Sequence, residues 1–461
     1  MKYNTSDTIV ALATPMGAGA LAVIRLSGAQ AVSIVNPCLN KPIPPEARRI
    51  YFRKFLDSNN QLLDQVVVAY FKGPASYTGE DVVEVSTHNN PLIVQGVIQR
   101  LTENGARLAE PGEFTYRAYL NQKMDLTQAE AVAEVIAART RASLTHSLRH
   151  LSGALRDRIV NIKQQVIQYL SLLEINLDFS DEDIEALPLE ALQAQLDKTI
   201  NELAHLIQSY AYGKLLDEGI QILFLGKPNV GKSSLLNRLI GEERAIVSNI
   251  PGTTRDYIEA QAQLDGILIK AVDTAGVRVT PNAIEALGIE RTLQQVARAD
   301  VVAAVFEAPH SPTTEDEHVM ELLRENQTEQ KPMVVLLNKI DLGEHEAWQS
   351  FFEGLDAPIV RISAHTGEGV EAFKAAVLAL FARERAFENE DVVVTSERHR
   401  EALERALKAL KNARQGVMLG MSDEFLAADI RAALSALGEI VGETTPQDIL
   451  NHVFANFCIG K

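Results

Sequence analysis

The chain is poor in cysteine and in positive charge, and it lacks long apolar runs. Among 461 residues the two cysteines, Cys38 and Cys458, are too few for a disulfide framework and too far apart for a zinc spacing. Lys and Arg number 44 against 61 Asp and Glu, so the net charge of −17 disfavours an extended nucleic-acid surface. No run reaches the ~18 apolar residues of a membrane span, and prolines and glycines interrupt the apolar stretch 8–24. We therefore expect a cytoplasmic protein without a membrane anchor.

The clearest motif present is Gly226-Lys-Pro-Asn-Val-Gly231-Lys232-Ser233, which lies between a strand-like stretch at 220–225 and a helical pattern. Such a loop turns backbone N–H groups toward phosphates, its lysine reaches the β- and γ-oxygens, and its serine ligates Mg²⁺. The following helix adds the positive end of its dipole. The sequence thus predicts a nucleotide site formed by Asn229, Val230, Gly231, Lys232, Ser233 and Ser234.

A second motif indicates which base is bound. Asn338-Lys339-Ile340-Asp341 follows the apolar stretch 333–337, and its last carboxylate can accept hydrogen bonds from the ring N–H and amine of guanine. Adenine offers no such pair of donors, and sites of this kind reject the wrong base strongly. We expect guanine to contact Asn338, Lys339 and Asp341, with Ser363 and Ala364 covering the base.

Two further segments match the switches of GTPases. The loop 248–256 suits a segment that becomes ordered around γ-phosphate and Mg²⁺, with Thr254 as a metal ligand. A turn after the strand-like stretch 268–272 is expected near Mg²⁺ and the γ-phosphate. Val277 stands where small GTPases often place a glutamine, so another residue must orient the attacking water. The predicted nucleotide contacts of these segments are Ser248, Asn249, Ile250, Pro251, Gly252, Thr253, Thr254, Asp273, Thr274, Ala275 and Gly276.

The patterns predict a multidomain α/β protein. Residues 1–120 show short strands and turns of an α+β domain, and 121–216 are helical. An α/β domain of the Ras-like, P-loop type is expected at 217–382, and helices resume at 383–461 with breaks at Gly416, Gly420 and 444–446. Because helical segments flank the nucleotide domain, we expect it to be inserted into one helical domain.

With these motifs the chain resembles the MnmE (TrmE) family of tRNA modification GTPases over essentially its whole length. The most specific matches are the segments 7–15, 77–81, 117–130, 252–256 and 457–461. GTPases of ribosome assembly share the central motifs but lack those near the two ends.

The resemblance implies a homodimeric, Mg²⁺- and K⁺-dependent GTP hydrolase. Family members form a heterotetramer with the FAD-dependent MnmG (GidA) subunit. Together they add a carboxymethylaminomethyl group to C5 of the wobble uridine of certain tRNAs. The one-carbon unit comes from 5,10-methylenetetrahydrofolate, for which 5-formyltetrahydrofolate is an analogue.

The resemblance also implies that the N-terminal domain binds folate and forms the dimer. By position the folate contacts are Arg25, Glu84, Lys123 and Lys461. The cations suit the carboxylates of a folate, and Glu84 suits the amide-like edge of its pterin. Cys458 falls near that site, although a small buried hydrophobe is an equal reading of it. The chain has His88-Asn89-Asn90 where the family has His-Gly-Gly. Because asparagine tolerates positive φ less freely than glycine, the resemblance does not fix the backbone conformation of this loop.

For hydrolysis, the resemblance assigns the orientation of water to Glu285, and we group Lys232 and Arg255 with it as catalytic residues. A K⁺ ion would supply the charge of an arginine finger, bound by Asn229, Ser248, Ile250 and Thr253. Two alternatives stay open: a ribosome-assembly GTPase of the Era/Der type, which the acidic balance and the C-terminal motif disfavour, and a folate-binding scaffold with a regulatory nucleotide switch.

Overall fold

The computed structural model describes residues 6–17, 19–44, 49–178, 189–242, 258–273, 295–328, 331–455, 457 and 460. They form two compact units. The first comprises Met1–Ala133, His150–Ile200 and Ala402–Lys461, and the second comprises Glu134–Arg149 and Asn201–Glu401. In the described residues, no helix is both long and apolar enough to cross a membrane.

The N-terminal part of the first unit is a mixed sheet with the strand order β3-β4-β5-β2-β1-β6. All neighbouring strands are antiparallel except β1 and β6, which are parallel. The strands are β1 (Ile9–Leu12), β2 (Leu21–Ser27), β3 (Ile50–Leu56), β4 (Leu62–Phe71), β5 (Val82–His88) and β6 (Arg107–Leu108). The apolar stretch 8–24 is therefore a strand, a turn and the start of a second strand, as its glycines indicate.

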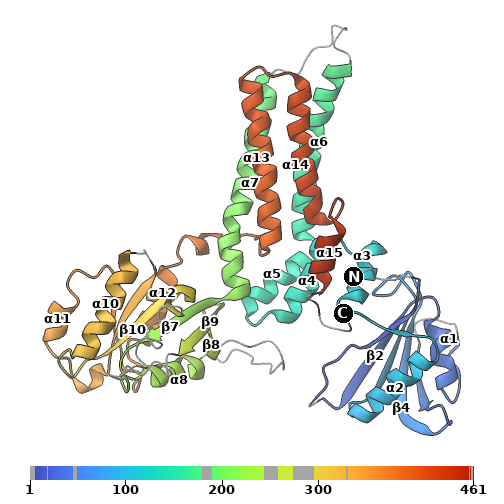
Figure 1. The fold of residues 1–461 in the computed structure, drawn as a ribbon, viewed down its shortest axis with the longest axis horizontal. Helices are drawn as coiled ribbons and strands as arrows, with labels where there is room; N and C mark the ends of the chain where they lie inside the picture. The colour runs from blue at the N-terminus through green and yellow to red at the C-terminus, as the bar shows by residue number, and fades with distance from the viewer. Residues whose placement is uncertain are drawn as a thin grey trace, which may run out of the picture. The chain divides into compact units, whose positions relative to one another are not determined.

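The two faces of this sheet differ. Alternate strand residues such as Ile24, Val68 and Val85 are buried against α1 (Ala31–Val35) and α2 (Pro91–Glu103), and the two helices lie on the blue sheet in Figure 1. On the opposite face, Phe52 of β3 is 65% exposed and pairs with Val67 of β4, which is 39% exposed. The sheet thus presents apolar side chains on the face that these two helices do not cover.

Helices complete the first unit, and among them α6 and α14 pack along one another (Figure 1). Ion pairs join neighbouring helices, for example Arg414 with Asp197 at 2.7 Å. The helices that lie in the first unit are α3 (Glu113–Leu120), α6 (Ala154–Asp178), α14 (Asp423–Val441) and α15 (Gln447–Ala455). Three helices have residues in both units, namely α4 (Leu126–Ala137), α7 (Leu189–Glu218) and α13 (Glu397–Met418), and α5 (Arg141–Leu151) lies almost wholly in the second unit.

One predicted helix break is wrong. Gly416 lies inside α13, whereas Gly420 and residues 444–446 do fall between helices. A Cβ atom on Gly416 would lie 2.5 Å from Cδ2 of Leu426 in α14. Glycine here permits a close approach of two helices, a role that the sequence pattern does not distinguish from a helix break.

The second unit contains a sheet with the order β12-β11-β10-β7-β9-β8, parallel except for the β8–β9 hairpin. Alternate residues of each strand pack on opposite faces of the sheet. For example, Phe224 packs against Phe373 of α12 on one face, and Phe306 packs against Trp348 of α11 on the other. The elements are β7 (Ile220–Leu225), α8 (Lys232–Glu242), β8 (Ile258–Leu264), β9 (Ile267–Asp273), β10 (Val301–Glu307), α10 (Thr314–Thr328), β11 (Met333–Asn338), α11 (Ala347–Phe351), β12 (Ile359–Arg361) and α12 (Val370–Ala379). Helices on both faces of a mainly parallel sheet confirm the predicted α/β class.

Candidate functional site

The predicted phosphate loop connects β7 to the first turn of α8 and depends on its glycines. Gly226 has φ +149°, and a Cβ atom there would lie 2.3 Å from the carbonyl oxygen of Val305 in β10. Gly231 has φ +102°, and its Cβ would lie 2.2 Å from Nδ2 of Asn338. Neither position can accept a side chain without displacing its neighbour. The loop therefore lies at the carboxyl ends of parallel strands, where open α/β sheets bind ligands.

Two lysines of the loop have different partners. Nζ of Lys232 donates to the carbonyl oxygens of Gly226 and Lys227 at 2.6 and 3.0 Å, which keeps the ammonium within the loop. Lys227 instead forms a buried ion pair of 2.8 Å with Asp316 of α10. Oδ2 of Asp316 also accepts from the backbone N–H of Thr313, which caps that helix. The sequence analysis missed this anchor, although Thr313 followed by Asp316 has the spacing of a capping box.

Asn338 joins the phosphate motif to the base motif. This side chain is 1% exposed; its Nδ2 donates to the carbonyl oxygen of Val230 at 2.7 Å, and its Oδ1 accepts from the N–H of Ala364 at 2.9 Å. Removing either partner would leave a buried polar group unsatisfied. Asn338 therefore acts as a clamp that holds three predicted contact segments together.

The remaining base-motif residues surround this clamp. Lys339 adopts φ +66° and its Nζ pairs with Glu307 at 2.7 Å, while Asp341 is exposed on the short 3₁₀ turn Ile340–Leu342. Ser363 is buried, and its hydroxyl accepts from the N–H of Thr366 at 3.1 Å. An exposed carboxylate therefore lies beside a loop that buried hydrogen bonds hold in place.

Several predicted residues lie outside the part of the chain that the structure describes. They are Ser248, Asn249, Ile250, Pro251, Gly252, Thr253, Thr254, Arg255, Thr274, Ala275, Gly276, Glu285, Cys458 and Lys461. For Asp273 only the backbone is described, at the end of β9.

In the first unit, Arg25 and Glu84 are cross-strand partners on β2 and β5. Nε and Nη2 of Arg25 lie 2.9 and 2.8 Å from Oε1 of Glu84, and both side chains are largely buried. Nη1 of Arg25 donates to the carbonyl oxygen of Gly460 at 3.4 Å, so the C-terminal motif contacts this pair. Lys123 is exposed, and its aliphatic stem lies against Gly79.

The His88-Asn89-Asn90 departure does not strain the backbone. Asn90 has φ −102° and caps α2 by accepting from the N–H of Leu92 at 2.9 Å. Nδ1 of His88 lies 2.8 Å from Oδ1 of Asp64. Neither asparagine has positive φ. The loop therefore does not need the backbone freedom of glycine at these two positions.

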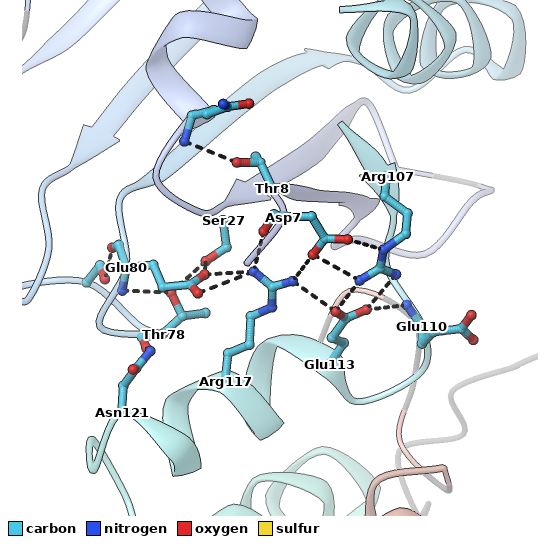
Figure 2. Close-up of polar contacts among 12 residues, drawn as sticks. Asp7, Thr8, Ser27, Thr78, Glu80, Arg107, Glu110, Glu113, Arg117 and Asn121 are labelled. Carbon is cyan, nitrogen blue, oxygen red and sulfur yellow. Dashed lines mark hydrogen bonds and ion pairs between the residues drawn. The ribbon is translucent and has the colours of Figure 1, made fainter. Parts of the chain in front are cut away.

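Beside the Arg25 pair lies an ion network that the sequence analysis did not identify. It contains Asp7, Glu80, Arg107, Glu113 and Arg117, and Figure 2 shows them converging from separate segments. The one local signal was the Glu113 and Arg117 spacing of four on a helix, which is typical of surface pairs. Three of the motifs that carry the family resemblance supply three of its five members, Asp7, Glu80 and Arg117.

Comparisons with known proteins show which family the chain belongs to. The family model described as GTP-binding protein TrmE N-terminus matches residues 8–123, and that of the MnmE helical domain matches 126–458. Proteins named tRNA modification GTPase MnmE are similar over 99% of this chain: 40% identical in Flavobacterium johnsoniae, 41% in Cytophaga hutchinsonii and 40% in Thermotoga maritima, covering 99%, 98% and 100% of those proteins. The similarity therefore extends over nearly the whole chain and not over the nucleotide domain alone. The chain belongs to the MnmE family of tRNA modification GTPases.

Proposed function

We propose that this chain couples K⁺-dependent GTP hydrolysis to a folate-dependent one-carbon transfer. With a flavin-containing partner, MnmG, it would add a carboxymethylaminomethyl group to C5 of the wobble uridine of certain tRNAs. Membership of the family supports the coarser part, a GTP hydrolase of tRNA modification. The observation that carries the nucleotide part is the Asn338 clamp, because it fixes the phosphate loop beside the segment that covers the base.

The chain's own residues suit GTP binding. The ammonium of Lys232 is held by two carbonyl oxygens and can exchange them for phosphate oxygens. Asp341 is exposed and can accept the two donors of guanine. We propose that Glu285 orients the attacking water and that Arg255 contributes charge near the phosphates.

The donor set fits two cations. Ser233 presents an exposed hydroxyl at the start of α8, and Mg²⁺ prefers oxygen ligands of this kind, with Thr254 proposed as the second. Asn229 is exposed at φ +65° and offers a side-chain oxygen at the loop, with Ser248, Ile250 and Thr253 proposed to complete a K⁺ site. When bound, K⁺ would supply positive charge to the transition state, as an arginine finger does.

The first unit suits a reduced folate. Oε2 of Glu84 accepts no hydrogen bond from the described residues, and it can accept from donors of a pterin. Arg25 is fixed in place by Glu84, and Lys123 supplies a second cation for folate carboxylates. We propose that Lys461 and Cys458 belong to the same site, because Gly460 of their segment contacts Arg25.

Homodimerisation through the N-terminal domain has support in the exposed face of its sheet. Ile50, Phe52 and Phe71 are 73%, 65% and 38% exposed there. Ile50 and Ala69 continue across the sheet to Glu84 and Arg25, so the apolar face and the proposed folate site are continuous. Exposed apolar patches of this kind mark interaction sites.

The test is the modification state of tRNA in a strain from which the gene is deleted. We expect the unmutated chain to restore the wobble modification, as measured by mass spectrometry of tRNA nucleosides. Glu84→Gln should fail to restore it while the purified variant hydrolyses GTP normally, because the two reactions use separate residues. Glu103→Gln, on the helix-covered side of the same domain, is the matched control and should restore it. Normal wobble modification in the deletion strain would rule out the proposal.

A further inference from the structure

Arg117 is the centre of a buried ion network in the first unit. Its side chain is 1% exposed, and Nη2 lies 2.7 Å from Oδ1 of Asp7 and 3.0 Å from Oε1 of Glu113. Nη1 donates to the carbonyl oxygen of Asp7 at 2.8 Å and lies 3.2 Å from Oε2 of Glu80. Arg107 contacts Asp7 and Glu113 from the more exposed side. In Figure 2 the guanidinium of Arg117 lies between Glu80 on one side and Asp7 and Glu113 on the other.

Glu80 extends this network into the segment 76–81, which we call the signature loop. Its Oε2 accepts from the hydroxyl of Ser27 at 2.6 Å, and that hydroxyl also lies 2.6 Å from Oγ1 of Thr78. The carbonyl oxygen of Thr78 accepts from Nδ2 of Asn121 at 2.7 Å. Ser27 follows Arg25 by two residues on β2. One carboxylate therefore ties Arg117 both to the signature loop and to the strand that carries Arg25.

The signature loop contacts two of the three cationic side chains proposed for the folate site, Arg25 and Lys123. The guanidinium carbon of Arg25 lies 5.3 Å from the ring centre of Tyr77 and 5.8 Å from that of Phe114. The hydroxyl of Tyr77 bonds to Thr115 at 2.9 Å, next to Phe114 on α3. At the other end of the loop, a Cβ on Gly79 would lie 3.3 Å from Cγ of Lys123. The loop thus supports two side chains that are far apart in sequence.

We infer that Glu80, which Arg117 holds in place, and Ser27 position the proposed folate site by fixing the signature loop against Arg25 and Lys123. The inference rests on the proposed folate function. Buried ion pairs contribute little net stability compared with apolar packing, but their directional contacts fix geometry. Site residues need such supporting contacts to stay within about half an ångström of their productive positions.

The test compares residues that reach the signature loop with one that does not. Glu80→Gln and Ser27→Ala break the link at the loop. Arg107→Lys perturbs the same network at Asp7 and Glu113, which makes it the matched control. All are measured in the full chain by calorimetry with 5-formyltetrahydrofolate, by hydrogen exchange of peptides covering 76–81, and by thermal unfolding.

We expect Glu80→Gln and Ser27→Ala to weaken folate binding about tenfold, a change equivalent to about 1.4 kcal/mol. Both should also speed amide exchange in the signature loop. Arg107→Lys should lower the unfolding temperature but leave folate affinity and loop exchange unchanged. Unchanged exchange in both loop-linked variants would overturn the inference, whether or not folate binds; an equal loss of folate affinity in all three would also overturn it and assign the network a general structural role. Absence of folate binding by the unmutated chain, with faster loop exchange in the variants, would instead refute the folate site and leave the loop-positioning part supported.

Discussion

Asn229 shows how much one residue of the phosphate loop can decide. It adopts φ +65°, a region that asparagine enters more readily than most residues, and its side chain is exposed beside the fixed Val230. The loop has no arginine that could place charge between the phosphates. An amide oxygen at this position is a suitable ligand for a monovalent cation.

We therefore predict that Asn229→Ala abolishes the stimulation of GTP hydrolysis by K⁺. In the unmutated chain, turnover should rise by about 10³-fold with K⁺, because charge stabilisation of this kind has that magnitude, and much less with Na⁺. Asn237→Ala on α8 is the control and should keep the response. Phosphate release in KCl and NaCl measures the effect, and equal turnover of the unmutated chain in the two salts would refute the cation site.

Secondary-structure elements were largely predictable where the signal is local. The strand at 220–225 and the loop after it follow from consecutive apolar residues and glycines, and β7 has those bounds. The contacts that fix the sites were not predictable. Asp7, Glu80 and Arg117 come from three segments up to 110 residues apart, and no periodicity relates them. Asn338 was assigned to the base motif, but its role as a clamp needs the positions of Val230 and Ala364.

Asp7 lies just before β1 and pairs with Arg117 of α3, and this contact should make the stability of the first unit depend on pH. Burial raises the pKa of Asp7, but hydrogen bonds from Arg107 and Arg117 outweigh it, so the pKa lies below its ordinary value of 3.8. The unfolded chain then binds a proton that the folded chain does not, and the stability from this carboxylate is lost as pH falls through the lowered pKa. Each such proton changes the free energy of unfolding by about 1.4 kcal/mol per pH unit.

We predict that Asp7→Asn lowers stability at neutral pH and makes it depend less on pH below 3.8. The unfolding temperature of the first unit, followed between pH 3 and pH 7, measures this pH dependence, because carboxylates titrate over roughly that range. Asp356→Asn, an exposed position of the second unit, is the control and should leave that transition unchanged. A steeper acid dependence in Asp7→Asn than in the unmutated chain would contradict the assignment.

At the scale of the whole molecule, the proposed homodimer should depend on the uncovered sheet face. In a two-fold interface the same patch meets its copy, so a single new carboxylate appears twice in the contact. We predict that Phe52→Glu on β3 gives a monomer in light scattering and sedimentation, because it buries two charges against apolar partners. Leu92→Glu, on α2 at the opposite side of the sheet and 78% exposed, makes the same chemical change and should leave the dimer intact. Phe52→Glu should also weaken folate binding as the dimer is lost, because the apolar face continues into the Arg25 and Glu84 pair. A dimeric Phe52→Glu variant would place the dimer contact elsewhere on the chain, and loss of the dimer in Leu92→Glu alone would place it on the helical side of this domain.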